Sequence, residues 1–244
     1  MDCHNGVVRF RVLACDFDGT IATDGVVEPA TLTALERVRR SGRRLLLVTG
    51  RTRTQLEAVF GRWELFHRVV LENGAVLVDP AAGTHRLLCS PVPSTLEPEL
   101  RRRGVEPLAV GQAIYAASVR HQQIIRDAIG TLGLSLDVVV NRGGLVILPA
   151  GVSKSSGIAA ALLDIGESAA ACVAVGDAEN DLPMLALVGC GVAVANALDQ
   201  VKAIADLVTL RPAGEGVAEL AARLVADDLA AELATSGGGG ATRH

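Results

Sequence analysis

The sequence predicts an α/β fold, in which helices cover both faces of a largely parallel sheet and a smaller α+β unit is inserted. Short apolar runs alternate with amphipathic helical patterns in both halves of the chain, which is typical of strand–helix–strand units. Residues 80–150 break this alternation and carry a cluster of prolines. We therefore expect residues 1–79 and 151–234 to form the sheet core, residues 80–150 the inserted unit, and residues 235–244 a flexible glycine-rich tail.

The first half of the chain predicts strands and helices in alternation. Pro29 suits the first turn of a helix, where its missing N–H is not needed, and Ser41-Gly42 provides a stop. Glu72-Asn73-Gly74 predicts a turn between two strands. The elements expected here are strands at 7–15, 45–48, 69–71 and 75–78 and helices at 29–40 and 52–60.

The inserted segment mixes helical and strand periodicities, and the parallel pattern resumes after it. In the inserted segment we expect helices near 94–103 and 119–133, a strand near 105–110, and two strands around residues 141–144. After it we expect helices at 153–163, 181–187 and 217–233 and strands at 171–175 and 191–194. The second half should therefore extend the sheet begun by the first.

Composition excludes several classes of partner. The formal net charge is −4 and aromatic residues make up 2% of the chain, so we expect no nucleic-acid partner. No apolar run is long enough for a membrane helix, and residues 1–10 lack a signal-peptide core. The cysteine count is odd, and Cys15, Cys172 and Cys190 lie in apolar runs. This pattern predicts buried thiols in a cytoplasmic protein. We separately expect either a monomer or a homodimer.

Polar and charged side chains follow several of the predicted strands. Asp16 and Asp18 come after the first strand, Thr49 after the second, Asp177 after a later one, and Lys154 begins a helix. A parallel sheet gathers such positions on one edge, where ligands bind. Clustered carboxylates without His or Cys favour Mg²⁺, whose usual co-ligands are phosphates. The pattern therefore indicates phosphoryl transfer.

Four motifs stand in order along the chain. They are Asp16-Phe17-Asp18-Gly19-Thr20 (DxDGT), Val48-Thr49-Gly50-Arg51, Lys154 in Gly151-Val152-Ser153-Lys154, and Gly176-Asp177-Ala178-Glu179-Asn180-Asp181 (GDxxND). On these motifs the chain resembles the haloacid dehalogenase superfamily of phosphohydrolases over about residues 8–230. The Thr-Gly-Arg form, the Glu72-Asn73-Gly74-Ala75 segment and the insertion resemble its Cof-type (IIB) group, which has a Rossmann-like core and a C2B cap.

The resemblance implies roles for the acidic residues. Asp16 would be the nucleophile that forms an aspartyl-phosphate, and Asp18 the general acid and base. Mg²⁺ would be held by Asp16, the main-chain carbonyl of Asp18 and Asp177. Asp181 would be either a further ligand or a partner that supports the ligands.

The resemblance also implies a phosphate-binding set. Thr49 and the Gly50 N–H would bind phosphoryl oxygens, Lys154 would neutralise charge, and Asn180 would support the substrate or Lys154. Taken alone, Thr49 is better explained as the N-cap of the helix that begins near residue 52, and Lys154 as a solvated side chain. Asn73-Gly74 is explained by a turn, so we leave it out of this set.

The insertion should select the substrate. At about 70 residues it resembles the compact caps of archaeal-type phosphoglycolate phosphatases more than the longer caps of many sugar phosphatases. Arg142 in the Asn141–Gly144 turn could bind a substrate carboxylate. The alternative is that Arg142 faces solvent in a hairpin and binds no substrate.

The sequence thus predicts a Mg²⁺-dependent phosphatase acting on a small phosphorylated metabolite, either phosphoglycolate or a sugar phosphate. Two alternatives stay open. One is a phosphomannomutase-like phosphomutase of the same superfamily. The other is a regulatory module that binds a phosphorylated metabolite within a larger protein, an alternative raised by the glycine-rich tail.

Overall fold

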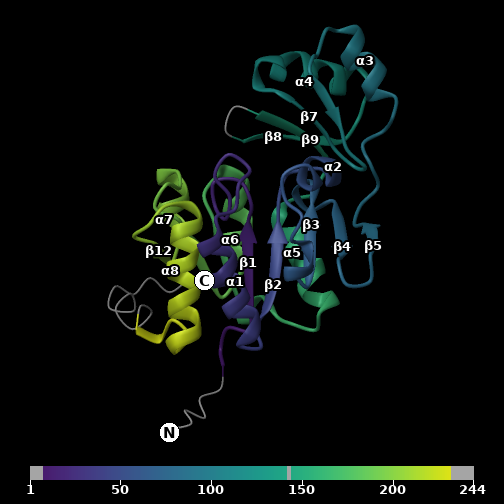
Figure 1. Ribbon diagram of the computed structural model, residues 1–244. Helices are drawn as coiled ribbons and strands as arrows, with labels where there is room; N and C mark the ends of the chain where they lie inside the picture. Colours follow the sequence, from purple (N-terminus) through teal and green to yellow (C-terminus); the bar gives the residue numbers. More distant parts are fainter. Residues whose placement is uncertain (1–7, 142–143, 232–244) are drawn as a thin grey trace, which may run out of the picture.

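Two sheets organise the chain. The computed structural model describes residues 8–141 and 144–231. The larger sheet has eight strands in the order β12-β11-β10-β1-β2-β3-β4-β5 (Figure 1). Strands β12 to β3 pair in parallel, whereas β4 and β5 pair antiparallel. Their bounds are β1 Val12–Asp16, β2 Arg44–Val48, β3 Arg68–Leu71, β4 Val76–Asp79, β5 Thr84–Leu87, β10 Cys172–Gly176, β11 Cys190–Ala193 and β12 Leu207–Val208. The expected α/β class is confirmed.

Helices cover both faces of this sheet. α1 and α8 pack against each other on one face, and α5 and α6 lie on the other (Figure 1). The bounds are α1 Pro29–Arg40, α2 Arg53–Glu57, α5 Lys154–Asp164, α6 Leu182–Leu187, α7 Asp199–Ile204 and α8 Ala213–Asp227. Within the described residues, no helix combines the length and apolarity needed to cross a membrane.

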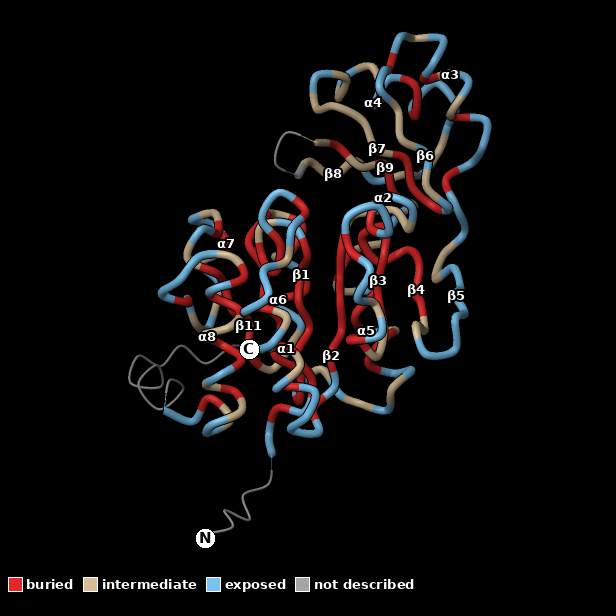
Figure 2. Tube along the Cα trace, in the orientation of Figure 1, coloured by how far each residue is buried: buried red, intermediate tan, exposed pale blue. Residues whose placement is uncertain are grey.

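The central strands are buried along almost their whole length. β1 is buried at all five residues and β2 at every residue except Arg44. Figure 2 shows the same contrast between buried central strands and the exposed edge strand β5. Helices on both faces explain why these central strands are continuous apolar runs rather than alternating ones.

The smaller sheet belongs to a second unit with its own apolar cluster. Its four antiparallel strands run in the order β6-β7-β9-β8. The elements are α3 Leu96–Arg102, β6 Leu108–Val110, β7 Tyr115–Ser118, α4 Gln122–Thr131, β8 Leu136–Asn141 and β9 Gly144–Pro149. The helices pack on the side of the sheet away from the core, and the strands lie above the carboxyl ends of the larger sheet (Figure 1). We call this unit the cap.

Several elements differ from those that the sequence suggested. β5 extends the larger sheet to Leu87, whereas the sequence predicts that the first core segment ends at residue 79. All four residues of β5 are exposed, so no apolar pattern marks it. β7, α7 and β12 were also missed, because short elements of two to six residues carry little periodicity.

Some boundaries also shift. β1 begins at Val12 rather than residue 7, and α2 ends at Glu57 instead of reaching residue 60. α8 begins four residues early, at Ala213, and its last turn is followed by Asp228 in the left-handed conformation. The expected tail at 235–244 lies outside the described residues.

The turn between β3 and β4 is packed against the start of α5, and this makes Gly74 a strong test of the fold. Gly74 has φ +109°, and a Cβ on it would lie 2.0 Å from the Ser153 main-chain oxygen. We expect Gly74→Ala to lower the free energy of unfolding by at least about 2 kcal/mol, through backbone strain plus overlap. Urea denaturation measures this change.

Gly104→Ala is the matched control for that substitution. Gly104 also has a positive φ, +79°, but a Cβ there meets nothing within 4 Å. Its cost should be backbone strain alone, about 1 kcal/mol. Equal losses for the two variants would contradict the close packing of the turn against α5.

Candidate active site

The carboxyl ends of β1, β2 and β10 meet at one edge of the larger sheet. β1 and β2 are in register so that Asp16 lies opposite Val48, the residue before Thr49. β10 pairs with the other side of β1 and ends one residue before Asp177. Three residues far apart in sequence therefore converge as the parallel pattern predicted.

Lys154 enters this edge from the first residue of α5. The helix starts there because the Ser153 hydroxyl accepts a hydrogen bond from the Ser156 N–H, as a helix cap. The Lys154 Nζ donates to Oδ1 of Asp16 and to Oδ1 of Asp181, each at 2.6 Å. Because Lys154 is only 2% exposed, these two carboxylates replace water around its ammonium.

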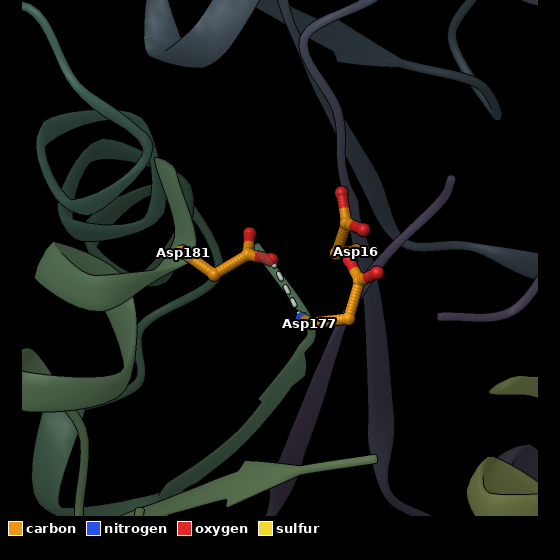
Figure 3. Close-up of side chains that lie close together, drawn as sticks. All are labelled: Asp16, Asp177 and Asp181. Carbon is orange, nitrogen blue, oxygen red and sulfur yellow. Dashed lines mark hydrogen bonds between the residues drawn. The ribbon is translucent and has the colours of Figure 1, made fainter. Parts of the chain in front are cut away.

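Asp181 organises the loop that follows β10. Its Oδ2 accepts hydrogen bonds from the N–H groups of Asp177, at 2.8 Å, and Ala178, at 3.0 Å; Figure 3 draws the first of these. Its Oδ1 accepts from Lys154. A Cβ on Gly176 would lie 2.6 Å from the Asp181 carboxyl carbon, so only glycine allows this close approach.

Three carboxylates form a cluster suited to a hard divalent cation. Asp16, Asp177 and Asp181 are buried and each offers an oxygen within 4.8 Å of the others (Figure 3). When ionised they carry −3, and the Lys154 ammonium reduces this to −2 (−3 + 1). Oxygen ligands and an excess charge of −2 fit Mg²⁺. The donor set is therefore consistent with the expected cofactor.

The buried charges shift one another's titration. Burial raises the pKa of Asp16 well above its usual value, and the Asp181 charge adds to this, while Lys154 opposes it. Burial lowers the pKa of Lys154, but the charges of Asp16 and Asp181 outweigh burial, so that its pKa is raised overall. The raised pKa of Lys154 favours its ammonium form, and further positive charge would favour the ionised form of Asp16.

Polar groups beside the carboxylates could bind a phosphoryl group. Thr49 is fully buried, and its hydroxyl oxygen accepts a hydrogen bond from the Arg51 N–H at 3.1 Å. Asn180 Nδ2 donates to Asn73 Oδ1 at 2.9 Å. In the part of the chain that the structure describes, the buried Asn180 Oδ1 has no hydrogen-bond partner. An unpartnered buried oxygen of this kind suits a donor or cation brought by a ligand.

Asp18 lies apart from the carboxylate cluster. Its side chain is 49% exposed and accepts two hydrogen bonds from Arg51, Nη2 to Oδ1 at 2.6 Å and Nε to Oδ2 at 2.7 Å. Arg51 also lies over the Phe17 ring, at 5.3 Å from its centroid. The exposed pair can open at little cost, while the ring holds the guanidinium in place.

A small cavity lies between this edge and the cap. It encloses about 210 Å³ and is lined from the core by acidic and amide side chains, including Asp16, Asp177 and Asn180. The cap contributes Ala116, Ala117, Gly144, Leu145 and Val146 from β7 and β9. Of the nine site residues predicted from sequence, Arg142 lies outside the described residues; the others are all near this edge.

Arg51 and Asn73 line this cavity, although the site predicted from sequence does not include them. Arg51 follows Thr49-Gly50 directly, so its place in the second motif was the available signal. Asn73 was set aside as a turn residue; it does lie in a turn, with φ +53°, but the turn also points its amide toward Asn180.

The comparisons with known proteins agree with this geometry. The family model for haloacid dehalogenase-like hydrolases matches residues 13–91 and 113–220. A phosphoglycolate phosphatase of Archaeoglobus fulgidus is 30% identical over 215 residues, which cover 86% of this chain and 94% of that protein.

Solved structures share the fold. A putative HAD/COF-like hydrolase from Plasmodium vivax has a TM-score of 0.76 at 20% identity, covering 89% of this chain and 96% of that chain. The subclass IIB sugar phosphatase BT4131 has a TM-score of 0.71 at 18% identity, covering 88% and 98%. The resemblance found in the sequence is confirmed, and the chain belongs to the haloacid dehalogenase-like hydrolases.

Proposed function

We propose that this enzyme is a Mg²⁺-dependent phosphatase that hydrolyses a small phosphorylated metabolite through an aspartyl-phosphate on Asp16. One observation carries the proposal: Asp16 is held by Lys154 within a buried group of carboxylates, directly below a cavity of about 210 Å³. The family match and the phosphoglycolate phosphatases among the relatives support it.

In the first step Asp16 attacks the phosphorus atom. Lys154 binds Oδ1 of Asp16, so we assign Oδ2 as the attacking oxygen. A bond forms between this oxygen and phosphorus while the bond from phosphorus to the leaving oxygen breaks. Protonated Asp18 gives its proton to that oxygen, and the product alcohol leaves.

In the second step water releases the phosphate. Asp18, now ionised, takes a proton from the water, whose oxygen bonds to phosphorus as the Asp16 carboxylate departs. Free phosphate and the original enzyme result. Asp18 must leave Arg51 to act as an acid, and the exposed position of their pair makes this exchange inexpensive.

The remaining residues would position the phosphoryl group. The Thr49 hydroxyl, the Gly50 N–H and the second N–H of Asn180 Nδ2 would donate to its oxygens, and Lys154 would hold the nucleophile in place. Asp16, the Asp18 carbonyl and Asp177 would hold Mg²⁺, and Asp181 would orient Lys154 and the 177–178 loop through the hydrogen bonds it accepts. Bound Mg²⁺ would neutralise the negative charge of the phosphoryl oxygens.

The substrate is proposed to be phosphoglycolate or a sugar phosphate. The cavity volume suits a small molecule, and described cap residues that line it are small or apolar. Three of the five cysteines, Cys15, Cys172 and Cys190, are buried, which supports a cytoplasmic setting.

Removing Mg²⁺ tests the proposal. With EDTA we expect phosphate release to fall by about 10³-fold or more, since the cation supplies several kcal/mol of transition-state stabilisation. Added Mg²⁺ should restore it. The measurement is phosphate release over a panel of phosphorylated metabolites, ranked by kcat/KM.

The same panel separates the proposal from its rivals. Unchanged turnover in EDTA would contradict the role of Mg²⁺. Isomerisation of a sugar phosphate with negligible phosphate release would favour a phosphomutase. Binding without turnover of any member would favour a regulatory module.

A further inference from the structure

Glu72 is a buried carboxylate that the proposed chemistry does not use. It is 1% exposed, and it lies in the turn between β3 and β4. Its two oxygens accept hydrogen bonds from three consecutive main-chain N–H groups: Gln112 at 2.8 Å, Ala113 at 2.8 Å and Ile114 at 3.2 Å. Charge-assisted bonds from several N–H groups are strong enough to fix a segment in place.

Those N–H groups belong to the cap segment that leads into β7. The Glu72 carboxylate approaches the main chain of this segment closely. A Cβ on Gly111 would lie 2.6 Å from Glu72 Oε2. Ala113 and Ile114 pack in the apolar cluster of the core and not in that of the cap. The Ala113 oxygen also accepts from the Val92 N–H at 3.0 Å, on the connection from core to cap. This segment is therefore a fixed point of the cap on the core.

The turn that carries Glu72 also contacts the phosphoryl site. Its N–H groups donate to the second-motif loop, Glu72 to the Arg51 oxygen at 3.1 Å and Asn73 to the Thr49 oxygen at 3.0 Å. Glu72 and Asn73 both have φ +53°, a costly conformation for residues other than glycine. The strained turn aims Glu72 at the cap and the Asn73 amide at Asn180.

The cap residues nearest the site follow the anchored segment at once. Ala116 and Ala117 of β7 line the cavity and come two and three residues after Ile114. A shift of the segment at 112–114 would carry both alanines with it. Displacements of about 1 Å in a catalytic assembly can cost about 10²-fold in rate.

We propose that Glu72 is a positioning residue: by binding the N–H groups of residues 112–114, it fixes the β7 face of the cap over the phosphoryl site. The catalytic part of this inference rests on the proposed phosphatase function. Glu72 touches neither the carboxylate cluster nor the leaving group; it acts through the cap segment.

The test compares Glu72→Gln and Glu72→Ala with the wild-type chain. Gln keeps one acceptor oxygen but loses the charge, and Ala loses both. For the best metabolite of the panel we expect kcat/KM to fall about 10-fold in Glu72→Gln and about 10²-fold in Glu72→Ala. For acetyl phosphate, whose acetate leaving group is weakly basic and departs with little assistance, we expect changes below about threefold.

Asp137→Asn is the matched control. The Asp137 carboxylate accepts from the Gly151 N–H at 3.0 Å, on the other connection between cap and core, and this bond is exposed. We expect Asp137→Asn to keep the wild-type ratio of kcat/KM between the metabolite and acetyl phosphate. If Glu72 were merely structural, its variants would have lower thermal stability and an equal loss of kcat/KM for both substrates. That result would overturn the proposal.

Hydrogen exchange gives a readout that does not depend on turnover. In both Glu72 variants the amides of residues 112–118 should exchange at least about tenfold faster, while Asp137→Asn leaves them protected. Unchanged protection would overturn the proposal even if the wild-type chain proved inactive. If the wild-type chain is inactive but the Glu72 variants exchange faster than it does, the anchoring role of Glu72 is supported and the phosphatase function is contradicted.

Discussion

Asp16→Asn should abolish phosphate release, with a loss of roughly 10⁴-fold or more in kcat, as when a covalent nucleophile is removed from an enzyme. An amide cannot form the aspartyl-phosphate. We expect the variant to fold, because Asp181 still accepts a hydrogen bond from Lys154 Nζ. The measurement is phosphate release in Mg²⁺, together with mass analysis of protein quenched during turnover.

The quenched samples decide between mechanisms. The wild-type chain should carry a phosphoryl group on the peptide that contains Asp16, and the variant should carry none. Asp164→Asn serves as control, because Asp164 lies in a surface ion pair with Arg68 and Arg86. It should keep activity within about twofold. Residual turnover in Asp16→Asn near the wild-type rate would show that water attacks phosphorus directly.

The central strands and the edge that holds the site could be predicted because the responsible residues are continuous in sequence. Each apolar run of β1, β2 and β10 is buried on both faces and ends at a polar residue. The position of Lys154 followed from the helix start at Ser153, although its two ion partners did not.

Contacts that depend on tertiary packing could not be predicted. The pairing of Asp18 with Arg51 depends on how two loops meet in the fold. The spacing of apolar residues in the sequence does not indicate such a contact. Glu72 and Asn73 read as a turn, and they form one; their bonds to the cap and to Asn180 involve partners about 40 and 107 residues away. The exposed strand β5 has Leu87 as its single apolar residue, too few for the alternation from which strands are predicted.

Lys154→Met should both destabilise and inactivate the enzyme. The ammonium lies between Asp16 and Asp181, and its loss removes the positive charge that both buried carboxylates share. Breaking a buried ion pair from one side costs roughly 3–5 kcal/mol, which urea denaturation in metal-free buffer would measure. Activity should fall by about 10³-fold or more, because a cation that positions the nucleophile and stabilises transition-state charge is lost.

Two further variants separate charge from fit. Lys154 is one of only two lysines in a chain rich in arginine. Lys154→Arg keeps the charge but places a larger, planar group where the side chain is 1% exposed, so we expect it to be inactive as well. Lys202→Met removes the other, partly exposed lysine and should leave stability and activity unchanged.

Mg²⁺ should recover part of the stability lost in Lys154→Met. Without Lys154 the cluster carries one more uncompensated negative charge, so a divalent cation gains more by binding, and binding to the folded state stabilises it. The unfolding midpoint of Lys154→Met should therefore rise more with Mg²⁺ than that of the wild-type chain. A variant as stable as the wild-type chain in metal-free buffer would contradict the view that the ammonium holds the carboxylates together.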